Sequence, residues 1–242
     1  ILDGLTYEIG MNYSYNKNSV KDVAQAYDGD TGGSLSNGQL TKRLMVDKPI
    51  YGWWLYEADG VWQTQEEINA NTHLGDPAPG HLKYKDQNND GVIDNRDKVY
   101  AGSYLPTSTY GIHLNAEYKN FDFSIAGYGV AGNKVYNGLK NLRIDGGENI
   151  TEETFKNRWT GPGSTNKHPG ANRDAISSTY FLESGSYFRI NNITLGYTFK
   201  DLISKGTKLR LYATAQNPFM FTGYSGFSPE ITGNGLPNET AG

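Results

Sequence analysis

Residues 86–97 read DQNNDGVIDNRD, a spacing of oxygen-bearing side chains typical of EF-hand-type calcium loops. These side chains occupy loop positions one, three, five, nine and twelve: Asp86, Asn88, Asp90, Asp94 and Asp97. Gly91 falls where such loops turn sharply, Val92 offers a carbonyl oxygen, and Ile93 is placed to anchor the loop inward. We therefore predict a structural Ca²⁺ site. Asp97 stands where glutamate is usual, and the alternative is an acidic surface turn without metal.

A second group with chemical potential is aromatic. Trp53, Trp54 and Trp62 lie close together in the sequence with Tyr56. Indole rings suit sugar faces and protein partners, so the three tryptophans are candidates for ligand or partner contact. The competing interpretation is that they pack this long loop onto the rim of a strand barrel.

Catalytic chemistry finds little support in the sequence. There is no cysteine, so thiolate metal sites and disulfides are excluded. The histidines at positions 73, 81, 113 and 168 do not have zinc-site spacing, and no nucleophile or phosphate-binding motif is present. The net charge of −4 gives no basic footprint for nucleic acid. We expect no enzyme activity.

The composition favours β-structure. Apolar residues make up only 36% of the 242, whereas the chain holds 18 tyrosines and 30 glycines. Period-two alternation predicts strands over residues 5–15, 107–118, 121–130, 186–199 and 207–217, each about long enough to cross a bilayer. The phase slips near Asn191–Asn192, which predicts a bulge.

The predicted connections are strongly unequal in length. Two are short, and those over residues 16–106 and 131–185 are very long. All short turns fall at one end, as in outer-membrane barrels with short periplasmic turns and long external loops. The alternative is a soluble, secreted calcium-stabilised β-sheet module that binds glycans. Lipid-facing aromatics at two heights would favour the barrel, whereas a sealed apolar core would favour the module.

The same alternation assigns side chains to faces. His113, Asn115 and Glu117 have the polar parity of their strand and are expected to face the barrel lumen. Residues 180–181 and 187–188 are aromatic and are expected to form an interfacial girdle. Glu66 and Glu152 look like residues of solvated helix starts, the second with Thr151 as its N-cap.

Several blocks of the sequence resemble SusC-like (SusC/RagA) TonB-dependent transporters. They are DGVWQ at 59–63 with EEI at 66–68, GD at 75–76, LKYK at 82–85 before the acidic loop, TYG at 109–111, EYKNFD at 117–122, SYFRINNITLGY at 186–197, AQN at 215–217, FTGYSG at 221–226 and PE at 229–230. The blocks keep the family's order over nearly the whole chain.

The resemblance implies an all-β fold, a transmembrane antiparallel barrel of about 22 strands with a plugged lumen, located in the bacterial outer membrane. The chain would supply its C-terminal portion, with the plug and the TonB box upstream and the last strand beyond it. Residues 218–242 would form an external loop. The implied function is active import of a nutrient, an oligosaccharide or a peptide, with a SusD-like surface lipoprotein and the TonB complex as partners.

Overall fold

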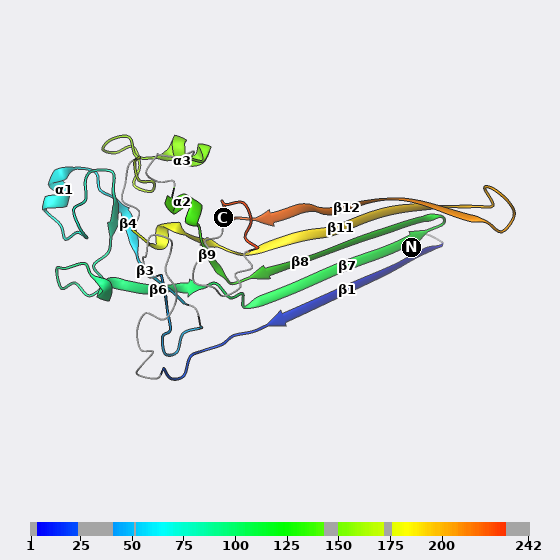
Figure 1. Ribbon diagram of the computed structural model, residues 1–242, viewed down its shortest axis with the longest axis horizontal. Helices are drawn as coiled ribbons and strands as arrows, with labels where there is room; N and C mark the ends of the chain where they lie inside the picture. Colours follow the sequence, from blue (N-terminus) through cyan, green and yellow to red (C-terminus); the bar gives the residue numbers. More distant parts are fainter. Residues whose placement is uncertain (1–3, 24–40, 51, 143–149, 172–175, 231–242) are drawn as a thin grey trace. The chain divides into compact units, whose positions relative to one another are not determined.

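The computed structural model describes residues 4–23, 41–50, 52–142, 150–171 and 176–230. The chain divides into two compact units. The strand unit holds a five-stranded antiparallel sheet in the order β1-β7-β8-β11-β12 (Figure 1). Its strands are β1 Leu5–Tyr15, β7 Ser108–Tyr118, β8 Phe121–Ala131, β11 Tyr187–Lys200 and β12 Lys208–Thr222.

The register aligns the strand ends on two sides of this sheet. Residues Lys119 and Asn120 alone connect β7 to β8, and Lys119 adopts a φ of 56° to close the turn. At the opposite end Tyr15 pairs with Ser108, which in turn pairs with Ala131. The long excursions leave from this second end, so the predicted segregation of loop lengths is present.

The predicted bulge lies at Asn191. On β8, Gly127 pairs with Ile190 and its neighbour Ala126 pairs with Asn192. Asn191 is therefore an extra residue in β11. β12 carries a matching irregularity at Asn217, where φ is 50°, and Pro218. The bulge shifts the parity of β11, which keeps apolar side chains on one face along the whole strand.

The second unit, here called the loop unit, comprises Asn18–Tyr104, Lys134–Glu183 and Tyr224–Gly242. The sequence predicted loops there, but the structure gives several small sheets. β2 (Lys42–Arg43), β3 (Gly52–Tyr56) and β6 (Lys98–Ser103) form one; β4 (Ala58–Val61) pairs with β5 (Leu82–Tyr84), and β9 (Lys134–Tyr136) with β10 (Leu182–Ser184).

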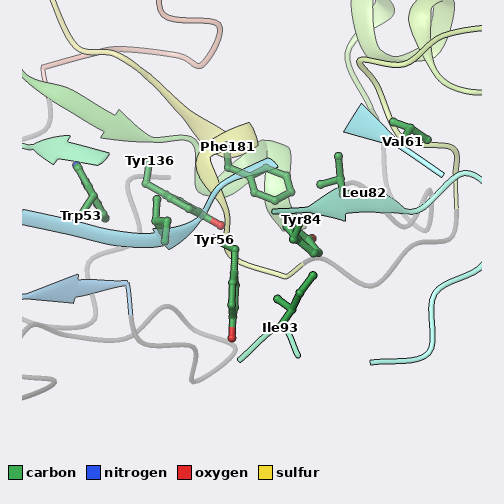
Figure 2. Packing of buried hydrophobic residues seen from close by; sticks show 9 residues of the cluster. Trp53, Tyr56, Val61, Leu82, Tyr84, Ile93, Tyr136 and Phe181 are labelled. Atoms are coloured by element: carbon green, nitrogen blue, oxygen red, sulfur yellow. The ribbon is translucent and has the colours of Figure 1, made fainter. Parts of the chain in front are cut away.

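The buried hydrophobic residues of the described chain lie in the loop unit. Their cluster joins both long excursions, with Tyr56, Val61 and Leu82 from the first and Tyr136 and Phe181 from the second (Figure 2). The loops therefore have a core of their own.

Short helices complete the loop unit: α1 Gln65–Asn69, η2 Asn95–Asp97, α2 Gly138–Leu142, α3 Glu152–Asn157 and η3 Thr179–Phe181. Thr64 caps α1 and Thr151 caps α3 through their side chains, which confirms the two predicted helix starts. None of the described helices is long and apolar enough to cross a membrane.

The expected last strand would follow residues 229–230. Residues 231–242 lie outside the described part of the chain.

Candidate functional site

One face of the strand unit carries aromatic rings in two rows. At the short-turn end, the register aligns Tyr118 with Phe121 and Phe121 with Tyr197, and the last two rings meet edge to face with centroids 4.7 Å apart. At the other end Tyr110 stacks on Phe188 at 6.0 Å. The rows give this face aromatic side chains at two heights.

The row far from the short turns is here called the upper row, and the row at the short-turn end the lower row. The upper row depends on a glycine between its two stacked rings. Gly129 pairs with both Tyr110 and Phe188, and a Cβ at this position would lie 2.7 Å from the Tyr110 ring. The same row extends to Tyr13 on β1 and Phe221 on β12 by register. Any larger residue at position 129 would push the rings apart.

Between the two rows the face is aliphatic. One cross-strand line, set by the register, consists of Ile9, Leu114, Ile125, Ile193 and Ala215. Tyr110 and Tyr118 are eight residues apart on β7, or roughly 27 Å along a strand at ~3.4 Å per residue. At a strand tilt of ~35–45° this gives about 20 Å along a membrane normal, close to the ~25 Å apolar band of outer-membrane barrels.

This apolar face is open in the described structure. The side chains of Met11 and Leu211 are 76% and 58% exposed, and Leu195 in the middle strands is 53% exposed. Soluble proteins rarely leave such a continuous apolar surface in water. The face is therefore built to be covered by an apolar environment.

The opposite face is polar, and it holds the three predicted lumen residues. His113, Asn115 and Glu117 share it, with the His113 ring above Gly10 and its Nε2 3.8 Å from a carboxylate oxygen of Glu8. Their side chains are mostly exposed. A lumen role for the three residues remains a prediction.

The polar face also contains an ion pair that sequence reasoning did not identify. Arg210 on β12 donates from Nε to Oδ1 of Asp122 on β8 at 3.0 Å, reaching across β11. Gly196 on β11 lies between the two side chains. Because glycine has no Cβ, the Asp122 carboxylate has room there; a Cβ at this position would clash with it. The arginine also lies over the Tyr212 ring at 4.7 Å. A period-two pattern shows that these residues share a face but not that they pair two strands apart.

The acidic loop is closed by its own carboxylates. Asp86 accepts hydrogen bonds from the backbone N–H groups of Asn89 (2.7 Å) and Gly91 (3.0 Å). Asp97 is fully buried, and its two oxygens accept from the N–H groups of Gln87 (2.9 Å) and Asp94 (2.8 Å). Asp97 thus ties the start of the loop to its end.

Backbone geometry and anchoring in the loop match the sequence prediction. Gly91 has a φ of 83°, and Ile93 is buried in the cluster of the loop unit. Asn88 and Asp90 each accept from the N–H two residues further on, at 2.8 and 2.9 Å. The donor set is entirely oxygen, which suits calcium.

A cation of the protein itself sits among these oxygens. Arg96 contacts the carboxylates of Asp90 at 2.8 Å and Asp94 at 2.9 Å, and its hydrogen bond lowers the pKa of Asp94. Within the described residues no three His, Cys, Asp or Glu side chains are arranged to hold a metal. The residues of the loop fit calcium by chemistry, but Asp90 and Asp94 would have to release Arg96 to bind it.

Cations cover all three candidate tryptophans. Trp53 and Trp62 are only 6% and 2% exposed, whereas Trp54 is half-buried. Lys42 lies 5.0 Å from the Trp53 ring centre, and burial lowers the pKa of this lysine. The other two rings are covered by Arg43 at 5.2 Å and Lys83 at 5.3 Å. Trp53 and Trp62 therefore pack the loop unit, and an accessible contact surface remains only at Trp54.

The predicted aromatic girdle is wrong for three of its four members. Tyr180 packs against the buried cluster of the loop unit. Phe181 is fully buried in the loop unit, and Tyr187 pairs with Val130 on the polar face of the sheet. Only Phe188 joins the apolar row. Adjacent residues of a strand point to opposite faces, so Tyr187 and Phe188 cannot both lie in one row, and residues 180–181 precede β11.

Comparison with known proteins agrees with this geometry. TonB-dependent receptor P26 of Formosa agariphila is 29% identical over 254 residues, covering 99% of this chain and 25% of the relative. TonB-dependent receptor SusC of Bacteroides thetaiotaomicron is 28% identical, covering 93% of this chain and 22% of the relative. No family model matches the sequence. The chain thus spans about a quarter of the length of these relatives.

The fold has solved counterparts. A structure described as the RagAB peptide transporter superposes with a TM-score of 0.72 at 18% identity, covering 95% of this chain and 25% of that one. These relatives and structural neighbours are receptors and transporters, not enzymes. Over 93–99% of its length the chain is similar to SusC-like TonB-dependent receptors of the bacterial outer membrane, as its sequence blocks predicted, and it shares the β-barrel fold of RagAB.

Proposed function

We propose that this chain is a wall section of an importer that takes up a nutrient across the outer membrane. The observation that carries the proposal is the open apolar face with aromatic rows at two heights, opposite a face of hydrogen-bonding and charged side chains. A barrel strand needs lipid on one side and water or protein on the other. The aromatic rows lie where the bilayer interfaces would be.

The complete importer requires more polypeptide than this chain. β1 and β12 are the outer strands of the described sheet, and open strand edges are not viable in hydrocarbon. Further strands must therefore continue from both. In our proposal the rest of the protein supplies them together with the plug, TonB supplies the energy, and a SusD-like lipoprotein covers the loops.

We propose an oligosaccharide as the cargo, with a peptide as the alternative. SusC-like members typically carry oligosaccharides, whereas the structural neighbour RagAB is described as a peptide transporter. The polar face, which carries amide, hydroxyl and carboxylate groups, suits either cargo.

Uptake assays test this function. Cells carrying the full-length protein should accumulate a fluorescent oligosaccharide, and deletion of the gene or of TonB should abolish the accumulation. Uptake that persists without TonB would contradict an energised importer. Accumulation of a labelled peptide instead of the sugar would keep the transporter but change the cargo. Co-purification from detergent extracts would test for the lipoprotein partner.

The secreted glycan-binding module is less compatible with the structure. A soluble β-sheet module would bury its apolar strand faces against each other. In the described residues these faces are open, and the buried cluster lies in the loop unit instead.

We also propose that the acidic loop binds calcium. The ligands would be the side chains of Asp86, Asn88, Asp90, Asp94 and Asp97 with the carbonyl of Val92. Calcium would supply charge neutralisation and fix a loop that otherwise loses entropy on ordering. Thermal unfolding of the full-length protein should shift upward with added calcium and downward with a chelator. An unfolding temperature that ignores both additions would refute this site.

A further inference from the structure

The turn between β11 and β12 projects beyond the rest of the sheet at the short-turn end. Tyr197 pairs with Phe121, the first residue of β8, whereas the pairing of β11 with β12 continues to Phe199–Leu209 and Lys200–Lys208. Figure 1 shows this hairpin, coloured yellow to orange, extending past the turn between β7 and β8.

The projecting tip is ordered by its own hydrogen bonds. The N–H of Asp201 donates to the carbonyl of Thr207 at 2.8 Å, and the Asp201 carboxylate accepts from the N–H of Gly206. The Thr207 hydroxyl accepts from the N–H of Ser204 at 3.2 Å. Positive φ values at Asp201 (56°) and Gly206 (89°) close the turn. The tip is therefore a defined structure.

This ordered tip presents two large aliphatic side chains to the outside. Leu202 is 58% exposed and Ile203 is 80% exposed. Turns at a water-exposed position usually carry polar residues instead. An ordered turn with adjacent exposed leucine and isoleucine is suited to an apolar or interfacial environment.

The same tip is rich in positive charge. Lys200 and Lys208 are direct cross-strand partners, and Lys205 lies in the turn, with Asp201 the one acidic residue of the segment. Among the described residues none of the three lysines forms an ion pair. Like charges directly opposite on neighbouring strands are destabilising. An external anion would relieve this repulsion.

We propose that the tip at residues 200–208 is a membrane-interface anchor that binds anionic phospholipid headgroups of the periplasmic leaflet. Leu202 and Ile203 enter the boundary between headgroups and acyl chains, and the lysines meet lipid phosphates. The pairing of apolar side chains with lysines is the amphipathic arrangement that binds anionic lipid surfaces. The inference rests on the proposed barrel-wall function.

The depth of the tip agrees with this assignment. Tyr118, Phe121 and Tyr197 form the lower aromatic row, which marks the hydrocarbon boundary. Phe199 lies two residues further along β11, or about 5 Å further along the membrane normal for a tilted strand. The headgroup layer on each side of a bilayer is roughly 5–8 Å thick, so the tip reaches that layer.

Spin-label accessibility in the full-length protein tests the anchor. Because this chain contains no cysteine, Ile203→Cys would introduce a single labelling position within it, and any cysteine elsewhere would be replaced. In nanodiscs of phosphatidylcholine and phosphatidylglycerol, the label at 203 should collide several-fold more with oxygen than with a water-soluble nickel chelate, relative to a label at Asn120→Cys in the other short turn. Leu195→Cys on the apolar face reports separately on the barrel wall.

The outcomes separate the two proposals. A lipid-type signal at 195 with a water-type signal at 203 would overturn the anchor and leave the barrel wall standing. A water-type signal at 195 would refute the proposed function itself. Lipid-type signals at both positions support the anchor.

A second experiment tests whether the lysines of the tip bind anionic lipid. Replacing phosphatidylglycerol by phosphatidylcholine alone should lower the oxygen preference at 203, and the variant with Lys200→Gln, Lys205→Gln and Lys208→Gln should no longer respond to the lipid change. A label at 203 that ignores phosphatidylglycerol in the parent sequence would overturn the headgroup assignment.

Discussion

Replacing Leu114 by arginine tests the lipid-facing side of the sheet most quantitatively. Leu114 lies between Ile9 and Ile125 on the apolar face, midway along β7 between Tyr110 and Tyr118 of the two aromatic rows. In a membrane barrel this position is at the bilayer midplane. The matched control is Asn115→Arg, one residue along the same strand on the polar face.

The structure sets the expected magnitudes. A lipid-facing arginine at the midplane of a barrel destabilises it by ~2–4 kcal/mol, and one near the interface by ~0–1 kcal/mol. Leu114→Arg should therefore lower the folded-to-unfolded ratio roughly 30- to 700-fold, since about 1.4 kcal/mol is tenfold. Tyr118→Arg, in the lower aromatic row, should cost about 1 kcal/mol or less. Asn115→Arg should cost similarly little, because Glu8 is its cross-strand neighbour.

Guanidinium unfolding of the full-length protein from lipid vesicles measures these differences. The variants should shift the midpoint without changing the slope, so that the shift reports stability. Equal losses for Leu114→Arg and Asn115→Arg would refute the assignment of the two faces. A loss below about 0.5 kcal/mol at Leu114, the usual range for surface substitutions, would refute burial in lipid.

Three further predictions concern the loop unit. Gln63→Ala should destabilise the loop unit by ~1–3 kcal/mol, because the side-chain oxygen of Gln63 accepts hydrogen bonds from the Trp159 indole and from a backbone N–H of the second excursion. Limited proteolysis should then cut the second excursion faster. Arg96→Gln should tighten calcium binding in titration calorimetry, because it frees two carboxylates. Stability of the unit should fall as pH falls below 6.5, because burial and nearby lysines lower the pKa of His168 in the folded state.

Each has a clear contrary result. Gln65 is an exposed residue of α1, and Gln65→Ala should leave the rate of proteolysis unchanged. Equal cutting of the two variants would argue against a stabilising role for the Gln63 hydrogen bonds. Unchanged or weaker calcium binding after loss of the guanidinium would show that Arg96 does not compete. The unfolded chain binds the His168 proton more readily than the folded one, so stability that rises on acidification, measured by hydrogen exchange of the loop unit, would contradict the direction of that pKa shift.

The strands were predictable because their signal is local. Alternation over ten residues requires one face to differ from the other, and β1, β7 and β8 were predicted within about one residue of their observed ends. β12 was predicted to end at residue 217 but continues to Thr222. Asn217 and Pro218 look like a turn in sequence, and the structure accommodates them as an irregularity within the strand.

The loop unit was not predictable because its contacts are non-local. β3 pairs with β6 more than forty residues later, and the tie at Gln63 joins segments about a hundred residues apart. Residue type alone made Trp53 and Trp62 candidates for contact residues. Their burial depends on the cations and rings that the fold brings around them, which the sequence does not show. In the acidic loop, the sequence predicted the spacing of the calcium ligands. It did not predict the ion pair between Arg96 and Asp90.

The central claim is that the five-stranded sheet is a section of a lipid-embedded barrel wall. The most direct measurement is a structure of the full-length protein in a lipid nanodisc, read at the outer edges of β1 and β12. We expect further strands to hydrogen-bond to both edges, and Met11, Leu114 and Leu195 to face lipid. A sheet whose apolar face packs on a protein core, with either edge left open to water, would contradict it.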